Sequence, residues 1–422
     1  MYNGIDNLED HMSNLAGEFL VFKAVVSDPE INHSLVVAKM SCSSINPQRL
    51  SQVMNAIING LAVYDVDVIS FCGDGASENV SFFEGVSNIS LKESLSVQTR
   101  DLFHSKDLED MLSFNIAMLN PLKCNGDFIF FIEDMPHVIK RIVNALDRSS
   151  NSSEKRNLKY GYRCMNLNLI QNIWKRTGGN LNTLSFTKLS TKHFEKDNFS
   201  RMRVYLAVQV LSGSVVKLIN MACQDKNIKL QFDREYYEPI IDLATHVNNL
   251  VDIINGRYEC FNKENGEEVI KSLLEILKWF DDWKKHNDND ESDNLDETNF
   301  LPKETWKGLR RMILGYIGMI DHYCLKHGLT IHPKRTLSDV CEHLFSKIRR
   351  TGGATSHPTC NIAHAAVHRD ALTQQGRENS RNIRGSNCQF DDSHQRGEKK
   401  RVIVQGISCL LYTSPSPRDE VL

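Results

Sequence analysis

The sequence lacks the features that mark membrane, secreted and zinc-finger proteins. Its 422 residues contain no run of eighteen apolar residues, so we expect no transmembrane helix and no membrane partner. The first residues are polar and acidic, unlike a secretory signal or a mitochondrial presequence. The 11 cysteines are scattered singly without a C-x-x-C pair, which indicates a reducing compartment and argues against a disulfide framework.

The chain also lacks a strong charge of either sign. A formal net charge of −3 gives no overall attraction to nucleic acid, so any DNA contact must come from local basic patches. The absence of G-x-x-x-x-G-K-[ST] excludes a Walker-type phosphate loop. Apolar residues at 41% and charged residues at 24% are typical of a globular protein, and the length predicts two or three domains.

Short apolar runs alternate with helical patterns in the first third of the chain. We predict strands at 34–42, 66–72 and 126–133, and helices at 47–63, from Ala76 onward and at 137–146. Functional side chains in α/β sheets gather at the carboxyl ends of strands. Asp74 and Asp134 each follow a predicted strand and are therefore candidate site residues, although Asp134 equally suits a cap for the helix opened by Pro136.

A mostly helical block follows a Ser/Asn-rich break. Long amphipathic stretches are expected at 199–222, 236–255 and 267–286, then an acidic loop or hinge at 286–299 and a further helical stretch at 305–325. The pattern His322-x-Cys324-x-x-His327, with His332 beyond, is the nearest approach to a metal cluster. Structural His and Cys on helices are the more common explanation of such a pattern.

A last helix is predicted at 337–350, where Asp339 and Glu342 lie three residues apart on one face. The opposite face is predicted to be a buried apolar stripe of Leu337, Val340, Cys341, Leu344, Phe345 and Ile348. Lys347, Arg349 and Arg350 follow them. A carboxylate pair beside basic residues suits metal-assisted chemistry on a phosphodiester, and it equally suits a solvated helix face. From about residue 374 the sequence is polar, with a basic cluster at 397–401, and 410–419 resembles translated sequencing adapter.

Five segments in order resemble the P element transposases and their THAP-domain relatives. These segments are D-G-A-S-E-N at 74–79, D-M-P-H-V-I-K-R-I-V-N at 134–144, K-L-S-T-K-H-F at 188–194, R-M-R-V-Y-L-A-V-Q-V-L-S at 201–212 and D-V-C-E-H-L-F-S-K-I-R at 339–349. The resemblance implies an α/β RNase H-like core interrupted by a mostly α-helical GTP-binding insertion. It also implies a nuclear protein that cleaves and transfers DNA at terminal inverted repeats, as a homo-oligomer, with Mg²⁺ or Mn²⁺ and GTP as cofactors.

The same resemblance assigns roles to individual residues. Asp74 and Glu342 correspond to catalytic, metal-binding acids, and Asp134 and His137 to a motif close to the active site. The residues that correspond to nucleotide contacts are Lys188, Val204, Ser212, Asp252, Asn255 and Asp339. The implied domains are a core at 1–148, an insertion at 149–300, a final core helix with the start of a C-terminal domain at 301–372, and a disordered tail at 373–422.

Two parts of the family pattern have no counterpart in this sequence. The family's first catalytic acid precedes the segment matched by 15–22, and Asp6, Asp10 and Asp28 do not follow a plausible strand. The zinc-coordinating THAP module is also missing. We therefore expect an N-terminally truncated or decayed transposase. The alternatives are a domesticated remnant that binds DNA or GTP without chemistry, and a helical scaffold whose acids only cap helices or face solvent.

Overall fold

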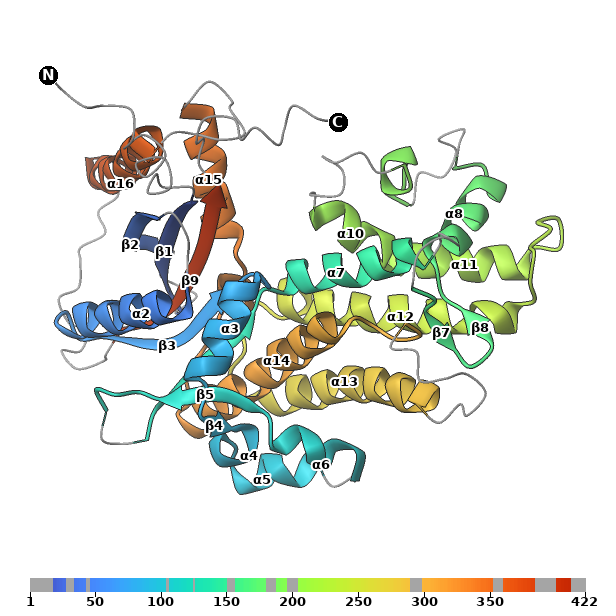
Figure 1. Cartoon of the computed structure of the whole chain (residues 1–422), viewed down its shortest axis with the longest axis horizontal. Helices are drawn as coiled ribbons and strands as arrows, with labels where there is room; N and C mark the ends of the chain where they lie inside the picture. Colours follow the sequence, from blue (N-terminus) through green and yellow to red (C-terminus); the bar gives the residue numbers. More distant parts are fainter. Residues whose placement is uncertain are drawn as a thin grey trace, which may run out of the picture. The chain divides into compact units, whose positions relative to one another are not determined.

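The computed structural model describes residues 18–27, 34–42, 46–103, 106–123, 126–149, 156–179, 187–195, 204–288, 298–351, 360–383 and 400–410. These residues fall into two compact units (Figure 1). The sheet unit comprises residues 1–89, 117–132 and 335–422, and the helical unit comprises residues 90–116 and 133–334. Each unit is therefore assembled from segments that are far apart in the sequence.

The main sheet is mixed and has seven strands in the order β2-β1-β9-β3-β6-β5-β4. Their bounds are β1 Glu18–Val26, β2 Ser34–Cys42, β3 Val66–Gly73, β4 Ile89–Ser90, β5 Asn115–Leu119, β6 Phe128–Glu133 and β9 Lys400–Leu410. β1 pairs antiparallel with β2 and with β9, β9 runs parallel to β3, and β5 pairs antiparallel with β6. The predicted strands at 34–42, 66–72 and 126–133 are thus confirmed.

The C-terminal strand β9 lies between β1 and β3, whereas the sequence predicts a disordered tail from residue 373. Its Val402, Ile403 and Val404 are at most 4% exposed. The register pairs Ile403 with Val25 on one side and with Ser70 on the other. Without β9, the inner edges of β1 and β3 would expose unpaired backbone groups. A short run of β-branched residues that pairs with both edges therefore stabilises the sheet. The helix α16, Cys360–Ile383, likewise extends beyond residue 373.

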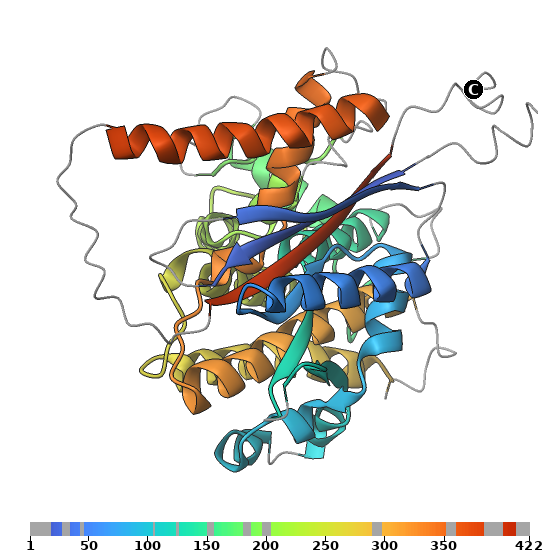
Figure 2. The ribbon, with the colours of Figure 1, turned by 90° about the vertical axis from the view of Figure 1, so that its left-hand side faces the viewer.

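Alternating side chains of β1 contact different helices. Phe19 and Val21 pack with α15, Asp339–Thr351, and with α16. Leu20, Phe22 and Ala24 belong to the core on the other face, together with α2, Pro47–Ala62, and α3, Ser77–Val86. This two-residue period is that of a strand buried on both faces. Figure 2 shows α15 and α16 on one side of β1, β2 and β9, and α2 on the other.

The predicted helix at 47–63 forms as α2 for local reasons. The Asn46 side chain accepts a hydrogen bond from the Arg49 backbone N–H at 2.8 Å, and Pro47 occupies the first turn, where its missing N–H costs nothing. The stripe Leu50, Val53, Met54, Ile57 and Ile58 is buried. The apolar spacing in the sequence identified this stripe correctly.

The helical unit contains ten α-helices among its described residues. They are α4 Leu91–Ser94, α5 Val97–Arg100, α6 Lys106–Leu112, α7 Met135–Arg148, α8 Leu167–Arg176, α10 Val204–Val210, α11 Gly213–Gln224, α12 Arg234–Asp252, α13 Gly266–Asp288 and α14 Lys303–Met319. Two π-helical turns, η4 at Ile253–Arg257 and η5 at Ile320–Lys326, continue α12 and α14. The shorter elements are a hairpin of β7 Lys159–Tyr160 with β8 Arg163–Cys164, and the 3-10 turns η1 Asp101–Phe103 and η3 Thr191–His193. A further 3-10 turn, η6 Pro333–Thr336, contains the boundary between the two units.

The helices of this unit pack in a continuous series. α7 contacts α10 and α14, α11 contacts α8 and α12, and α13 contacts α12 and α14. The stretch Val204–Gln224 is long and apolar enough to cross a membrane by composition, and 44% of its most apolar window is buried inside the structure. Its two helices, α10 and α11, contribute core residues such as Leu206, Val210 and Leu218. The mixed sheet with many helices confirms the predicted fold class at that level.

Candidate functional site

The junction between α10 and α11 contains a network of polar groups. Ser212 occupies the N-cap position of α11, and its hydroxyl donates to the Gln209 carbonyl at 2.8 Å. The Gly213 backbone N–H donates to Oδ1 of Asn248 at 2.7 Å. The first turn of a helix carries unsatisfied backbone N–H groups and a partial positive charge, which favour a bound phosphate.

Asn248 connects this helix start to α12. Its Nδ2 donates to Oδ2 of Asp252 at 2.8 Å, one helical turn further along. Asn248 therefore joins Gly213, the residue directly after Ser212, to Asp252, which lies far along the sequence. The sequence analysis missed Asn248, because an Asn four residues before an Asp on a helix is too common to stand out.

The loop that carries Lys188 is attached to the same junction. His193, which is 2% exposed, accepts a hydrogen bond at Nδ1 from the Ser190 backbone N–H at 3.0 Å, which leaves the proton on Nε2. Nε2 donates to Oε1 of Gln209 at 2.9 Å. Gln209 thus holds the loop through its side chain and Ser212 through its carbonyl.

The other predicted nucleotide residues lie as follows. Lys188 is exposed, Val204 opens α10 half-buried, and Asn255 is exposed on η4. All three belong to the helical unit, as do Ser212 and Asp252. Asp339 belongs to the sheet unit instead, at the start of α15, and its side chain lies outside the described residues.

Asp74 follows β3 directly, as predicted. Its Oδ1 accepts hydrogen bonds from the Ala76 backbone N–H at 3.2 Å and from Nδ2 of Asn79 at 2.7 Å. These two contacts hold the turn between β3 and α3 and orient the carboxylate. The residues D-G-A-S-E-N therefore form one local unit in which the Asn at its end supports the Asp at its start.

Asp134 occupies the N-cap position of α7, as the cap interpretation expects, but its side chain makes no capping hydrogen bond. Its buried carboxylate lies 2.6 Å from Nδ1 of His137 instead. The preceding residue, Glu133, is also buried and pairs with Arg141 of α7. Gly308 of α14 packs directly on this pair, where a Cβ atom would collide with both side chains.

The predicted apolar stripe of α15 is confirmed for its described members. Cys341, Leu344, Phe345 and Ile348 are buried against β1 and α16. Glu342 is half-buried and Arg349 and Arg350 are exposed. Lys347 forms an ion pair with Asp370 of α16, so this lysine has a structural partner as well as its predicted phosphate role.

The acids of the sheet unit do not amount to a complete magnesium site. Two-metal catalysis requires several carboxylates around the ions. Among the residues that the structure describes, neither Asp74 nor Glu342 belongs to a group of three ligand side chains within reach of one ion. β9, the neighbour of β3, contains no Asp or Glu. The described residues thus do not fit a full metal centre, and we derive no catalytic step through one.

The polar network at the α10–α11 junction lies in a segment with known relatives. Residues 136–266 match the family model of the TNP-like, GTP-binding insertion domain. The matched segment contains the predicted nucleotide residues from Lys188 to Asn255, and Asn248 as well. It begins earlier and ends earlier than the predicted insertion at 149–300, whose bounds stay a prediction.

The whole chain also has a structural neighbour. It is similar to the Drosophila P element transposase in a strand transfer complex, with a TM-score of 0.56 and 16% sequence identity. The match covers 82% of this chain and 75% of that chain. A likeness at this identity shows a shared fold. No curated protein sequence matches the chain. The resemblance to transposases is thus supported at the level of the fold and of the GTP-binding insertion domain.

Proposed function

We propose that this chain is a transposase-like protein that binds GTP through the helical unit and DNA through basic side chains. The hydrogen-bonded network from Ser212 and Gly213 through Asn248 to Asp252 is the observation that carries the nucleotide site. The network lies within the segment that matches a GTP-binding insertion domain. It joins a helix start suited to phosphate with a carboxylate suited to a base.

The two ends of the network have different chemistry. The Gly213 N–H donates to Asn248 and the Val215 N–H to the Ser212 carbonyl, so the positive end of the α11 dipole would attract a phosphate, and the exposed Lys188 adds a positive charge on the adjoining loop. The Asp252 carboxylate accepts hydrogen bonds only, so it suits the exocyclic amine and ring N–H of guanine. Adenine presents an acceptor at that ring position. Asp252, with Asn255 beyond it, would therefore favour GTP over ATP.

Titration of the full chain with GTP and with ATP by isothermal calorimetry tests this proposal. Asp252→Ala is expected to lower the affinity for GTP at least tenfold relative to ATP, because it removes the acceptor for guanine. Asp225→Ala, at the opposite end of α11, is the matched control, since Asp225 bonds only locally to Asn227. An unchanged ratio of GTP to ATP affinity in the Asp252 variant would refute the assignment.

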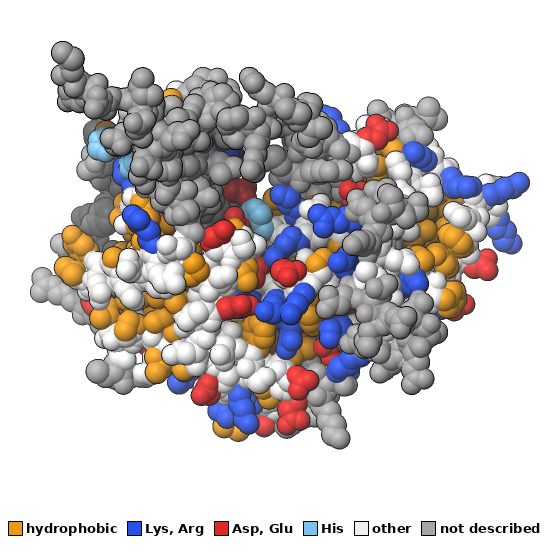
Figure 3. Space-filling view, viewed as in Figure 1, with side chains coloured by type: hydrophobic (Ala, Val, Ile, Leu, Met, Phe, Trp, Pro, Cys, Tyr) orange, Lys and Arg blue, Asp and Glu red, His pale blue; other side chains and the backbone are white. Residues whose placement is uncertain are grey.

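Basic side chains on two contacting helices support DNA binding. α7 carries Lys140 and Arg148, and α14 carries Lys303 and Lys307. Figure 3 shows Lys and Arg side chains gathered near the middle of the face seen in Figure 1, where α7 and α14 run. Such a patch compensates for the weak net charge, because phosphate contacts are local. Binding to terminal inverted repeats, a homo-oligomeric state on DNA and a nuclear location belong to the same proposal.

DNA cleavage is the finer part of the transposase proposal. Asp74 and Glu342 would then serve as metal ligands of an RNase H-like core with Mg²⁺ or Mn²⁺. The absence of an acid from β9, the strand beside Asp74, favours the second candidate, a remnant that binds GTP and DNA without cleaving DNA. A nicking assay on supercoiled DNA with Mn²⁺ separates the two. Nicking that disappears in Glu342→Gln would establish cleavage and reject the remnant.

A further inference from the structure

We propose that His322 and His327 form a binding site for a transition-metal dication such as Zn²⁺. Both residues lie on or directly after the π-helical turn η5, Ile320–Lys326, in the helical unit. The two histidines do not belong to the polar network at the start of α11. The proposal is therefore independent of nucleotide binding.

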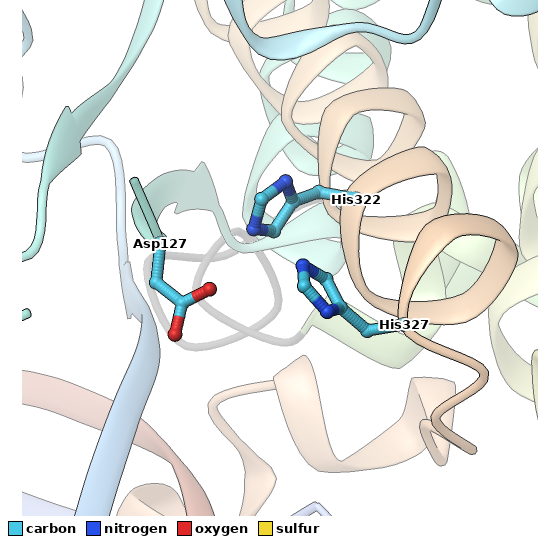
Figure 4. A group of neighbouring side chains, drawn as sticks. All are labelled: Asp127, His322 and His327. Carbon is cyan, nitrogen blue, oxygen red and sulfur yellow. The ribbon is translucent and has the colours of Figure 1, made fainter. Parts of the chain in front are cut away.

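The π-helical turn is what brings the two imidazoles together. In a regular α-helix, residues five apart point in directions about 140° apart. A π-helical turn closes over five residues, so positions i and i+5 come close to one face. The ring centroids of His322 and His327 are 4.7 Å apart with an interplanar angle of 63°. Figure 4 shows the two rings side by side; Asp127, also drawn there, belongs to the sheet unit.

The distances suit one shared ion after a small movement. Each ring offers a nitrogen within 4.8 Å of the other. Two nitrogens on one tetrahedral Zn²⁺, each about 2.0–2.1 Å from the metal, are about 3.3 Å apart. His322 is 1% exposed and His327 is exposed, so a change in the side-chain torsion angles of His327 can bring its ring to this spacing. Water would complete the coordination sphere.

The other potential ligands on this turn have structural roles. The Cys324 side chain is buried, and its Sγ donates to the Phe261 carbonyl at 3.5 Å. This thiol is therefore already engaged inside the core. The carboxylate of Asp321 accepts from the Ser96 backbone N–H at 2.6 Å and from the Ser96 hydroxyl at 2.8 Å. The pattern His-x-Cys-x-x-His therefore provides two nitrogen ligands and no sulfur ligand.

Two neutral imidazoles also define the class of metal. Nitrogen ligands suit Zn²⁺, Ni²⁺ and Cu²⁺, whereas Mg²⁺ and Ca²⁺ prefer oxygen. A pair of protein ligands gives weaker binding than the four of a structural zinc site. We accordingly expect a reversible site of weaker affinity than a structural zinc site.

Calorimetric titration of the full chain with ZnCl₂ at pH 7.5, in a buffer that does not bind zinc, tests the proposal. We expect one site, and an affinity at least tenfold lower in His327→Ala. His343→Ala, which removes an exposed histidine from α15, is the matched control and should retain wild-type affinity. Since His327 is exposed, its replacement should leave the fold intact, and circular dichroism checks this.

Three results would overturn the site. They are the absence of Zn²⁺ binding by the wild-type chain, equal affinity in the wild-type and His327→Ala proteins, and an equal loss of affinity in His327→Ala and His343→Ala. A parallel titration with GTP should give the same affinity in His327→Ala as in the wild type. Loss of Zn²⁺ binding alone thus reports on the metal site and not on the proposed nucleotide function.

Discussion

Because β9 lies at the centre of the sheet, we expect the side chain of Ile403 on this strand to contribute strongly to the stability of the sheet unit. Ile403 is 0% exposed, and its strand pairs with β1 on one side and with β3 on the other. Ile403→Ala removes three carbon atoms from a site that two flanking strands prevent from collapsing. Replacements of this kind cost about 2–5 kcal/mol. We expect about 3 kcal/mol, which is more than a hundredfold in the unfolding equilibrium.

The measurement must report on the sheet unit by itself. All 4 tryptophans lie in the helical unit, at positions 174, 279, 283 and 306, so tryptophan fluorescence does not monitor the sheet. Hydrogen exchange followed by mass spectrometry resolves peptides from β1 and β3 directly. In Ile403→Ala their backbone amides should exchange much faster, while peptides from α12 and α13 keep their wild-type rates.

The matched control is Leu35→Ala on β2 in the same sheet. Leu35 is 55% exposed, so its replacement should change the stability by less than about 0.5 kcal/mol. Removal of residues 411–422 should leave the exchange of β1 and β3 unchanged, whereas removal of 400–422 should abolish their protection. If Ile403→Ala and Leu35→Ala had the same small effect, β9 would not occupy the centre of the sheet and the reasoning would fail.

Three further predictions concern the helical unit. Asn248→Ala should weaken GTP binding about tenfold by calorimetry, because both its hydrogen bonds are lost, and an unchanged affinity would exclude Asn248 as a positioning residue. Gly308→Ala should cost about 1–3 kcal/mol in a tryptophan-monitored urea titration, since its Cβ would force the Glu133–Arg141 pair to shift, whereas Gly256→Ala, whose added Cβ has open space around it, should be nearly neutral. Burial lowers the pKa of His246, so the unfolded state binds the proton more tightly and stability should fall as the pH drops below about 6.5. His246→Phe, which retains an aromatic ring beside Trp279, should lose less stability between pH 7.5 and pH 5.5 than the wild type does; equal losses would contradict this role.

Local sequence patterns determined most of the individual elements. Apolar spacing identified α2, β3 and the buried stripe of α15, because each of these patterns depends only on neighbours within a few residues. The acid after β3 was found in the same way, and the structure adds Asn79 as the support for Asp74. Resemblance to known transposases, supported by the fold and by the match at 136–266, supplied the candidate nucleotide residues.

Tertiary structure decided which of these residues meet. Asn248 joins Gly213 to Asp252 through contacts that no sequence spacing encodes, and the side chain of Asp134 turns to His137 where a helix cap was an equal alternative. The choice of Lys400–Leu410 as the strand between β1 and β3 depends on two strand edges that exist only once the sheet has formed. A π-helical turn, invisible to a helical-period analysis, aligns His322 with His327. Local propensity is a property of short segments, whereas pairing between distant segments depends on the backbone groups and surfaces that the rest of the fold leaves unsatisfied.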